Sequence, residues 1–133
     1  MMMRKNDSKR KSFKYDNEKL YLSVSSYANN GRLAIMCECD DGELYGDITV
    51  NLPEYFVPDN SYAFINQITK DCGLEKVLMN KKIIKSIFGT YKYNYGKYDM
   101  VQFDLEELKK YDPIGLESFL ELNSIELEKS ISI

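Results

Sequence analysis

Residues 33–52 read LAIMCECDDGELYGDITVNL and predict two β-strands joined by a tight turn. Before the Asp-Asp-Gly triplet at 40–42, Leu33, Ile35, Cys37 and Cys39 alternate with Ala34, Met36 and Glu38. After it, polar and apolar residues alternate over 47–52, which is typical of a strand with one buried face. Gly42 supplies the positive φ that a hairpin turn requires, and Pro53 ends the second strand because it has no backbone N–H to donate. A hairpin alone is only marginally stable, so further strands or helices must cover one of its faces.

The flanking segments predict those further elements. Leu20, Leu22 and Val24 alternate with polar residues over 19–27, and Asn30-Gly31 is a strong hairpin-turn signal. Segments 74–80 and 105–111 predict short helices, 98–103 predicts a final strand, and 61–68 fits either a short helix or a strand. The prediction is an α+β fold, with an antiparallel β-meander of about four to five strands and two or three short helices packed on it.

The two ends of the chain differ in character. Residues 1–14, MMMRKNDSKRKSFK, are basic and lack an apolar period, which predicts a disordered arm before a single α+β domain over 15–133. Such an arm either touches phosphates or an acidic partner, or simply solubilises the protein. After Pro113, apolar residues recur at helical spacing and glutamates fall on the opposite face, which predicts an acidic amphipathic C-terminal helix. That helix either packs on its own domain or docks in a partner's groove.

Composition narrows the class of function. The 133 residues include no histidine, so the usual imidazole base of hydrolases is missing, and no Gly-rich phosphate motif occurs. We expect a non-enzymatic protein without a cofactor. Cys37, Cys39 and Cys72 suit reduced, buried thiols, and a zinc site would need carboxylates to complete it, so no metal is expected. No signal peptide or membrane span is evident, which predicts a cytoplasmic protein that does not contact a membrane.

The net charge of −3 is segregated along the chain as basic, acidic, basic and acidic segments. The acidic segments supply candidate partner-binding side chains, and acidic surfaces suit basic partners. Asp40, Asp41 and Glu43 could instead hold a metal, although adjacent carboxylates beside a glycine are typical of a turn. The candidates are Glu38, Asp40, Asp41, Glu43, Asp47, Glu106, Glu107, Glu117 and Glu121.

The basic segments support an alternative hypothesis, a nucleic-acid-binding module that uses the arm and the Lys/Tyr-rich segment 81–98. On a strand, tyrosines spaced by two line one face, and aromatics interleaved with lysine are typical of surfaces that stack single-stranded bases. Cross-strand aromatic packing accounts for the same pattern without a ligand. The residues concerned are Arg4, Lys5, Lys9, Arg10, Lys11, Tyr91, Lys92, Tyr93 and Tyr95.

Three short motifs resemble a known family: DGELY at 41–45, TVNLP at 49–53 and AFIN at 63–66. They are similar to the DGExYxxxTVNLP and AFIDxN pattern of small bacterial proteins of unknown function carried by conjugative transposons, plasmids and phages, with Asn66 where the pattern has Asp. The likeness covers about residues 19–105. It implies an accessory protein of a mobile genetic element that inhibits a host defence complex, of the anti-CRISPR or antirestriction type. The expected partner is then a host defence protein or nucleoprotein, whose basic nucleic-acid channel an acidic surface can occupy.

Overall fold

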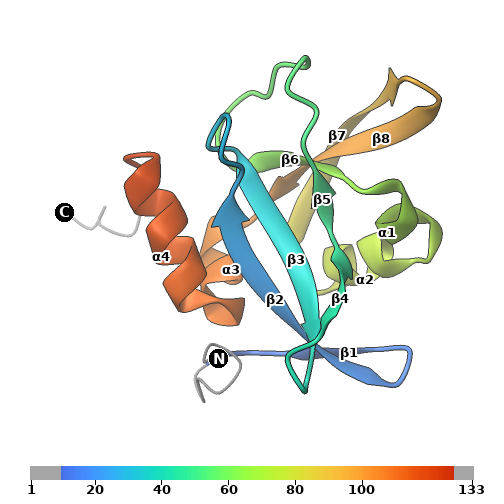
Figure 1. Ribbon diagram of the computed structural model, residues 1–133, viewed down its shortest axis with the longest axis vertical. Coiled ribbons are helices and arrows are strands. Elements are labelled where there is room, and N and C mark those ends of the chain that lie inside the picture. Colours follow the sequence, from blue (N-terminus) through green and yellow to red (C-terminus); the bar gives the residue numbers. More distant parts are fainter. Residues whose placement is uncertain (1–9, 128–133) are drawn as a thin grey trace.

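The computed structural model describes residues 10–127 and contains eight strands and four helices within that range (Figure 1). The α+β class and the antiparallel pairing are confirmed, but the strands form two four-stranded sheets and not one. The first sheet contains β1 (Phe13–Tyr15), β2 (Glu18–Ser26), β3 (Leu33–Cys39) and β4 (Leu44–Asp47). The second contains β5 (Thr49–Val50), β6 (Tyr62–Ile65), β7 (Ile84–Tyr93) and β8 (Gly96–Phe103). The helices are α1 (Gln67–Asp71), α2 (Leu74–Asn80), α3 (Leu105–Tyr111) and α4 (Pro113–Leu122).

The first sheet is a meander in the order β1-β2-β3-β4. The two predicted turns are confirmed, since Gly31 has a φ of 72° and Gly42 a φ of 90°, both in the region that favours glycine. Strands β2 and β3 pair with Leu22 opposite Cys37 and Val24 opposite Ile35, so their apolar side chains share the buried face. The binary pattern of the sequence therefore sets the register of this sheet.

Ile48 is the point where the chain passes from the first sheet to the second. Its N–H donates to the Ile35 carbonyl and its own carbonyl accepts from Asn66 N, both at 2.9 Å. The Thr49 hydroxyl accepts from Ile35 N at 3.0 Å. These bonds divide the predicted strand after residue 43 into β4 and β5.

The second sheet has the order β5-β6-β8-β7. The segment 61–68, which fitted either a helix or a strand, contains a strand followed by the start of a helix. Strand β6 ends at Ile65, and Asn66 then caps α1 by accepting from Ile68 N at 2.9 Å. The predicted helices over 74–80 and 105–111 are confirmed as α2 and α3.

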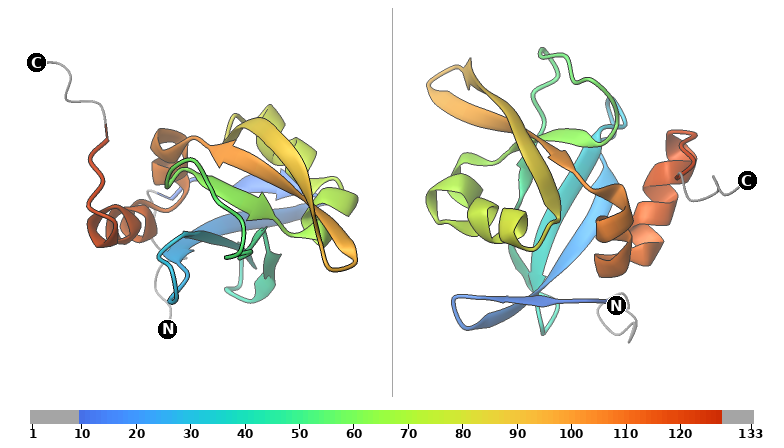
Figure 2. Two further views of the ribbon diagram at one scale, coloured as in Figure 1. Left: turned by 90° about the horizontal axis from the view of Figure 1, so that it is seen from above. Right: turned by 180° about the vertical axis from the view of Figure 1, so that it is seen from behind.

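The main core lies between the two sheets and beneath the helices (Figure 2). Helices α3 and α4 cover one side of the sheets and α1 and α2 the other (Figure 1). A second, smaller cluster around Leu52, Phe64 and Met100 lies on the opposite face of the second sheet. Both faces of that sheet are therefore used for packing. The largest fully buried side chains are Tyr111, Phe64, Phe103, Phe119, Leu20, Leu22, Leu33, Ile35, Ile48, Ile65, Leu78 and Ile83.

The outer edge of β2 explains why the prediction of a disordered arm over 1–14 is wrong for residues 10–14. Strand β1 pairs only with residues 18–20, which leaves the rest of the β2 edge open. The buried Arg10 guanidinium covers it by donating from Nη2 to the Leu22 carbonyl at 2.6 Å, and Asp112 Oδ2 accepts from Val24 N at 2.8 Å. The sequence pattern missed this because the contacts are long-range. Residues 1–9 lie outside the described part of the chain.

The acidic C-terminal helix is confirmed as α4, but it ends at Leu122. Asn123 follows as its C-cap and Ser124 has a φ of 52°, a conformation that stops helix propagation. Ile125 and Leu127 then pack against the main core from an irregular segment. The apolar spacing that suggested a longer helix therefore reflects core contacts made by two different backbone conformations.

Candidate functional site

The β3–β4 hairpin end brings together four of the predicted acidic residues. Asp41 Oδ1 accepts from Glu43 N at 3.0 Å, which is the local bond of an aspartate turn, and Asp40 Oδ1 accepts from the Tyr21 hydroxyl at 3.1 Å. Asp40, Asp41 and Glu43 are exposed, and Glu38 is half-buried on β3. No three side chains among residues 10–127 converge as a metal ion would require. These carboxylates therefore shape the turn and charge its surface.

The β1–β2 turn adds two carboxylates, those of Asp16 and Glu18, that sequence reasoning missed. Asp16 and Asn17 form a two-residue turn with φ values of 51° and 63°. The pKa of the Cys39 thiol is raised, first by burial and then by the charges of Glu18, Asp41 and Glu43, so carboxylates of both hairpins lie near Cys39. Asp-Asn between two alternating segments was the available sequence signal.

We call the set formed by Asp16, Glu18, Glu38, Asp40, Asp41 and Glu43 the acidic end. Within residues 10–127 none of these six carboxylates forms an ion pair. Opposite charge near these carboxylates comes from Lys14 and Lys19, which face each other across β1 and β2, and from Arg10, which like Lys19 lies over the Tyr21 ring. The acidic end therefore keeps a net negative charge.

Apolar side chains lie exposed within the acidic end. Leu44 is 60% exposed and Tyr45 is 39% exposed, both at the start of β4. The Tyr45 ring packs edge-on against Tyr15, with ring centroids 6.3 Å apart, and the Tyr15 hydroxyl donates to the Cys72 carbonyl at 2.6 Å. Tyrosine is enriched at protein-binding surfaces, where a polar rim surrounds the central contacts.

Asp47 does not join the acidic end, because it lies at the far end of β4. Its backbone carbonyl accepts from the Thr69 hydroxyl at 2.9 Å, which ties β4 to α1. Its side chain is exposed beside Tyr27, whose pKa is raised first by burial and then by the Asp47 charge, against a lowering contribution from Thr49. Asp47 therefore belongs to a different surface, the one near Tyr27 and α1.

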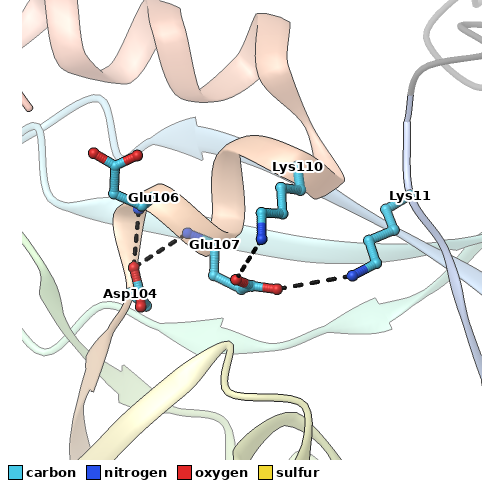
Figure 3. Close-up of polar contacts among 5 residues, drawn as sticks. All are labelled: Lys11, Asp104, Glu106, Glu107 and Lys110. Atoms are coloured by element: carbon cyan, nitrogen blue, oxygen red, sulfur yellow. Dashed lines mark hydrogen bonds and ion pairs between the residues drawn. The ribbon is translucent and has the colours of Figure 1, made fainter. Parts of the chain in front are cut away.

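The acidic residues of α3 are largely engaged in contacts of their own (Figure 3). Glu107 lies between Lys110, at 3.1 Å, and Lys11, at 3.9 Å. Asp104 caps the helix by accepting from Glu106 N and Glu107 N at 3.0 and 3.1 Å. Glu106 is exposed and points away from this group.

The acidic residues of α4 lie beside a lysine. Glu117 and Glu121 are exposed and border the same surface hollow as Lys109. Figure 1 places α3 and α4 along one side of the molecule, away from the β3–β4 turn at its lower end. The predicted acidic residues therefore form separate surfaces, of which the acidic end holds the most carboxylates.

The structure disperses the predicted nucleic-acid residues. Arg10 is buried and stacks on Tyr21, with the guanidinium carbon 5.2 Å from the ring centre, and Lys11 pairs with Glu107. Lys92 is exposed on β7, while Arg4, Lys5 and Lys9 lie outside the described residues. The described part of the arm thus serves folding contacts.

The three tyrosines do not form one free stacking face. Tyr91 packs on Tyr55 and Phe64, with ring centroids 5.3 and 5.9 Å away, and Tyr93 lies 6.4 Å from Tyr55. Tyr95 is fully exposed in the β7–β8 turn, because Asn94 has a φ of 54° and ends the strand at Tyr93. Tyr91 and Tyr93 therefore pack against the loop that contains Tyr55, and Tyr91 also packs against Phe64 of β6.

A buried carboxyl pair was not predicted from the sequence. Asp99 on β8 accepts from the Thr90 hydroxyl at 2.6 Å and pairs with Lys70 at 3.2 Å. Burial alone would raise the pKa of Asp99, but hydrogen bonds from Thr90, Glu75 and Lys70 outweigh it and lower the pKa. Burial, followed by the hydrogen bond and charge of Asp99, raises the pKa of Glu75 to about 7. Glu75 is therefore expected to keep its proton in mildly acidic solution and to share it with Asp99, and the cluster joins α1 and α2 to the β7–β8 hairpin.

This pair predicts a pH-dependent stability. Between pH 4.5 and about 7 the folded protein keeps the Glu75 proton that the unfolded chain has released, so the free energy of unfolding should fall as the pH rises through this window. Glu75→Gln keeps a donor toward Asp99 and has no charge to bury, so it should flatten the slope and be more stable at pH 8 by about 2 kcal/mol. Urea unfolding from pH 4.5 to 8 measures this, with the exposed Glu106→Gln as control. Parallel profiles for the wild type and Glu75→Gln would contradict the shared proton.

Cys37 is the buried thiol of the core, and burial, followed by the charges of Cys39, Glu38 and Cys72, raises its pKa to about 12. It is therefore a neutral apolar side chain at physiological pH. Cys39 is half-buried and Cys72 is exposed.

The two stacked sheets, the flanking helices and the acidic end define a small α+β domain with a charged hairpin surface. The chain belongs to the family described as a domain of unknown function, DUF4313, whose model matches residues 21–122. The expected membership in a family of unknown function is thereby confirmed. The match extends beyond the expected range of about 19–105 and includes α4. No curated protein and no solved structure matches the chain. Within residues 10–127 no helix is long and apolar enough to cross a membrane.

Proposed function

We propose that this protein is a non-enzymatic binding protein that docks its acidic end on a basic surface of a partner protein. The observation that carries the proposal is the concentration of six carboxylates, without an ion pair among residues 10–127, around the exposed Leu44 and Tyr45. Negative charge steers association with a positive surface, and a central apolar contact then slows dissociation. Hydrogen bonds to Asp40 and Asp41 hold the β3–β4 turn, which lowers the conformational entropy that binding would cost.

The partner we propose is a host defence complex, inhibited on behalf of a mobile genetic element. The sequence resemblance described above supports this context, since accessory proteins of such elements often disarm defences of the CRISPR and restriction types. These complexes hold nucleic acid in basic channels, and a hairpin lined with carboxylates offers a charge pattern similar to that of a phosphate backbone. Competition with nucleic acid for such a channel would be the mechanism of inhibition.

Affinity capture tests this function. The tagged full-length chain is incubated with a bacterial lysate that contains CRISPR and restriction effectors, with and without nuclease, and bound proteins are identified by mass spectrometry. The proposal predicts a stoichiometric effector that survives nuclease treatment and is eluted by salt. It also predicts that the purified effector loses its nucleic-acid binding when the chain is added. Recovery of nucleic acid alone, lost on nuclease treatment, would contradict the proposal and favour the nucleic-acid-binding alternative.

A further inference from the structure

Strand β7 lies at the edge of the second sheet and pairs on one side only, with β8. It spans ten residues and is the longest strand among residues 10–127. Figure 2 shows it running along the border of the sheet into the protruding β7–β8 hairpin. The open edge of a long strand presents backbone donors and acceptors that can pair with another chain.

Side chains cover parts of the open edges of β2 and β4. Arg10 and Asp112 cover the β2 edge, and Thr69 covers the Asp47 carbonyl on β4. On β7 the Lys92 carbonyl accepts from the Tyr55 hydroxyl. Between residues 85 and 89, no hydrogen bond from the described chain is made other than those with β8. This stretch is therefore available to a partner strand.

The side chains of the open stretch are apolar and basic. Ile87 is 42% exposed and Phe88 is 56% exposed, and Phe88 is held edge-on against Tyr62 at a centroid distance of 5.6 Å. The exposed Lys85 and Lys92 flank these two residues. Residues 81–98 carry five lysines and no acidic residue, so the charged side chains of β7 itself are all basic.

The charge pattern selects the kind of partner. If a second copy paired antiparallel about the centre of β7, between Phe88 and Gly89, Lys85 would lie opposite the partner copy's Lys92, and like charges facing each other destabilise a strand pair. A strand with acidic side chains would place opposite charges at the same positions. Bulges in β7 on either side of residues 86–87 limit the regular stretch, which suits a short segment. We propose that β7 binds an extended acidic segment of a partner protein, which adds to the second sheet as a further strand.

The same lysines could meet a nucleic acid, but the neighbouring rings favour a strand. Tyr91 and Tyr93 are packed against Tyr55, so stacking a base on their faces would break existing contacts. Backbone pairing along residues 85–89 needs no such rearrangement.

Fluorescence anisotropy with the full-length chain tests this proposal. The probe is a labelled peptide of about nine residues in which Glu alternates with Val, a length typical of one strand. A second peptide carries N-methyl groups on alternate amides, which preserves its charge and removes the backbone donors. A labelled oligothymidine tests the nucleic-acid alternative. The variants are Lys85→Glu/Lys92→Glu and, as a control with an equal change in charge, Lys14→Glu/Lys76→Glu.

Strand addition predicts that the acidic peptide binds and that N-methylation weakens binding by about tenfold, because several backbone hydrogen bonds are lost. Lys85→Glu/Lys92→Glu should weaken binding by about tenfold as well, and the control pair by less than about twofold. The proposal would be overturned if the N-methylated peptide bound as tightly as the unmodified peptide. It would also be overturned if only the oligothymidine bound, or if neither the acidic peptide nor the oligothymidine bound. Neutralising the acidic end should leave peptide binding unchanged, so this test is independent of the proposed function.

Discussion

Replacement of Asp112 by alanine is expected to lower the free energy of unfolding by about 3 kcal/mol, a large part of the stability of a domain of this size. Asp112 is fully buried between the end of α3 and the start of α4. Its Oδ1 accepts from Gly115 N at 3.0 Å, and its Oδ2 accepts from Val24 N at 2.8 Å. The substitution removes both acceptors and leaves two buried donors without these partners, each at a cost of about 1 to 3 kcal/mol.

Thermal and urea unfolding measure this effect, and the midpoint temperature should fall by about 10 °C. The matched control is Asp104→Ala, which removes the N-cap of α3 at a position that water reaches. It should cost about 1 kcal/mol. Asp112→Asn keeps one acceptor oxygen and should fall between the two alanine variants. An Asp112→Ala variant no less stable than Asp104→Ala would contradict the assigned role in joining α4 to the β2 edge.

Neutralisation of the acidic end is expected to weaken partner binding by at least about tenfold at physiological salt. The variant is Glu38→Gln/Asp40→Asn/Glu43→Gln, which preserves side-chain size and leaves Asp41 to form the turn. Loss of three charges should slow association most strongly, because long-range attraction to a basic surface steers the encounter. The salt dependence of the affinity should become shallower for the same reason.

The control for this variant is Glu106→Gln/Glu117→Gln/Glu121→Gln on α3 and α4, which changes the net charge equally at exposed positions. Surface plasmon resonance with the captured effector compares both variants with the wild type at several salt concentrations. The helix variant should bind within about twofold of the wild type. Equal losses for the two variants would mean that total charge matters and not the acidic end.

Local patterns predicted much of this fold. Alternation identified β2 and β3, and Gly31 and Gly42 identified their turns, because each of these signals depends on neighbours in the sequence. Asp104 before α3 and Asn66 before α1 are helix caps of the same local kind, but neither was predicted. Four members of the acidic end, at residues 38–43, were predicted on the same basis.

The features that were missed depend on contacts between distant segments. Strand β1 has three residues and exists because Arg10 and Phe13 pack against β2 and Tyr111. Ile48 separates two sheets through bonds to Ile35 and Asn66, which no alternation can reveal. A glutamate in the first turn of a helix is ordinary in sequence, so Glu75 gave no sign of its partner Asp99.

Site-specific photo-crosslinking tests most directly whether the acidic end is the surface that the partner contacts. A photoreactive amino acid replaces Leu44 in one variant and the exposed Ser118 of α4 in another, and each is irradiated with the captured effector. The proposed function predicts a crosslinked product from the Leu44 position, mapped to a basic nucleic-acid channel, and none from the Ser118 position. A product from Ser118 with none from Leu44 would contradict it and would place the interface on α4.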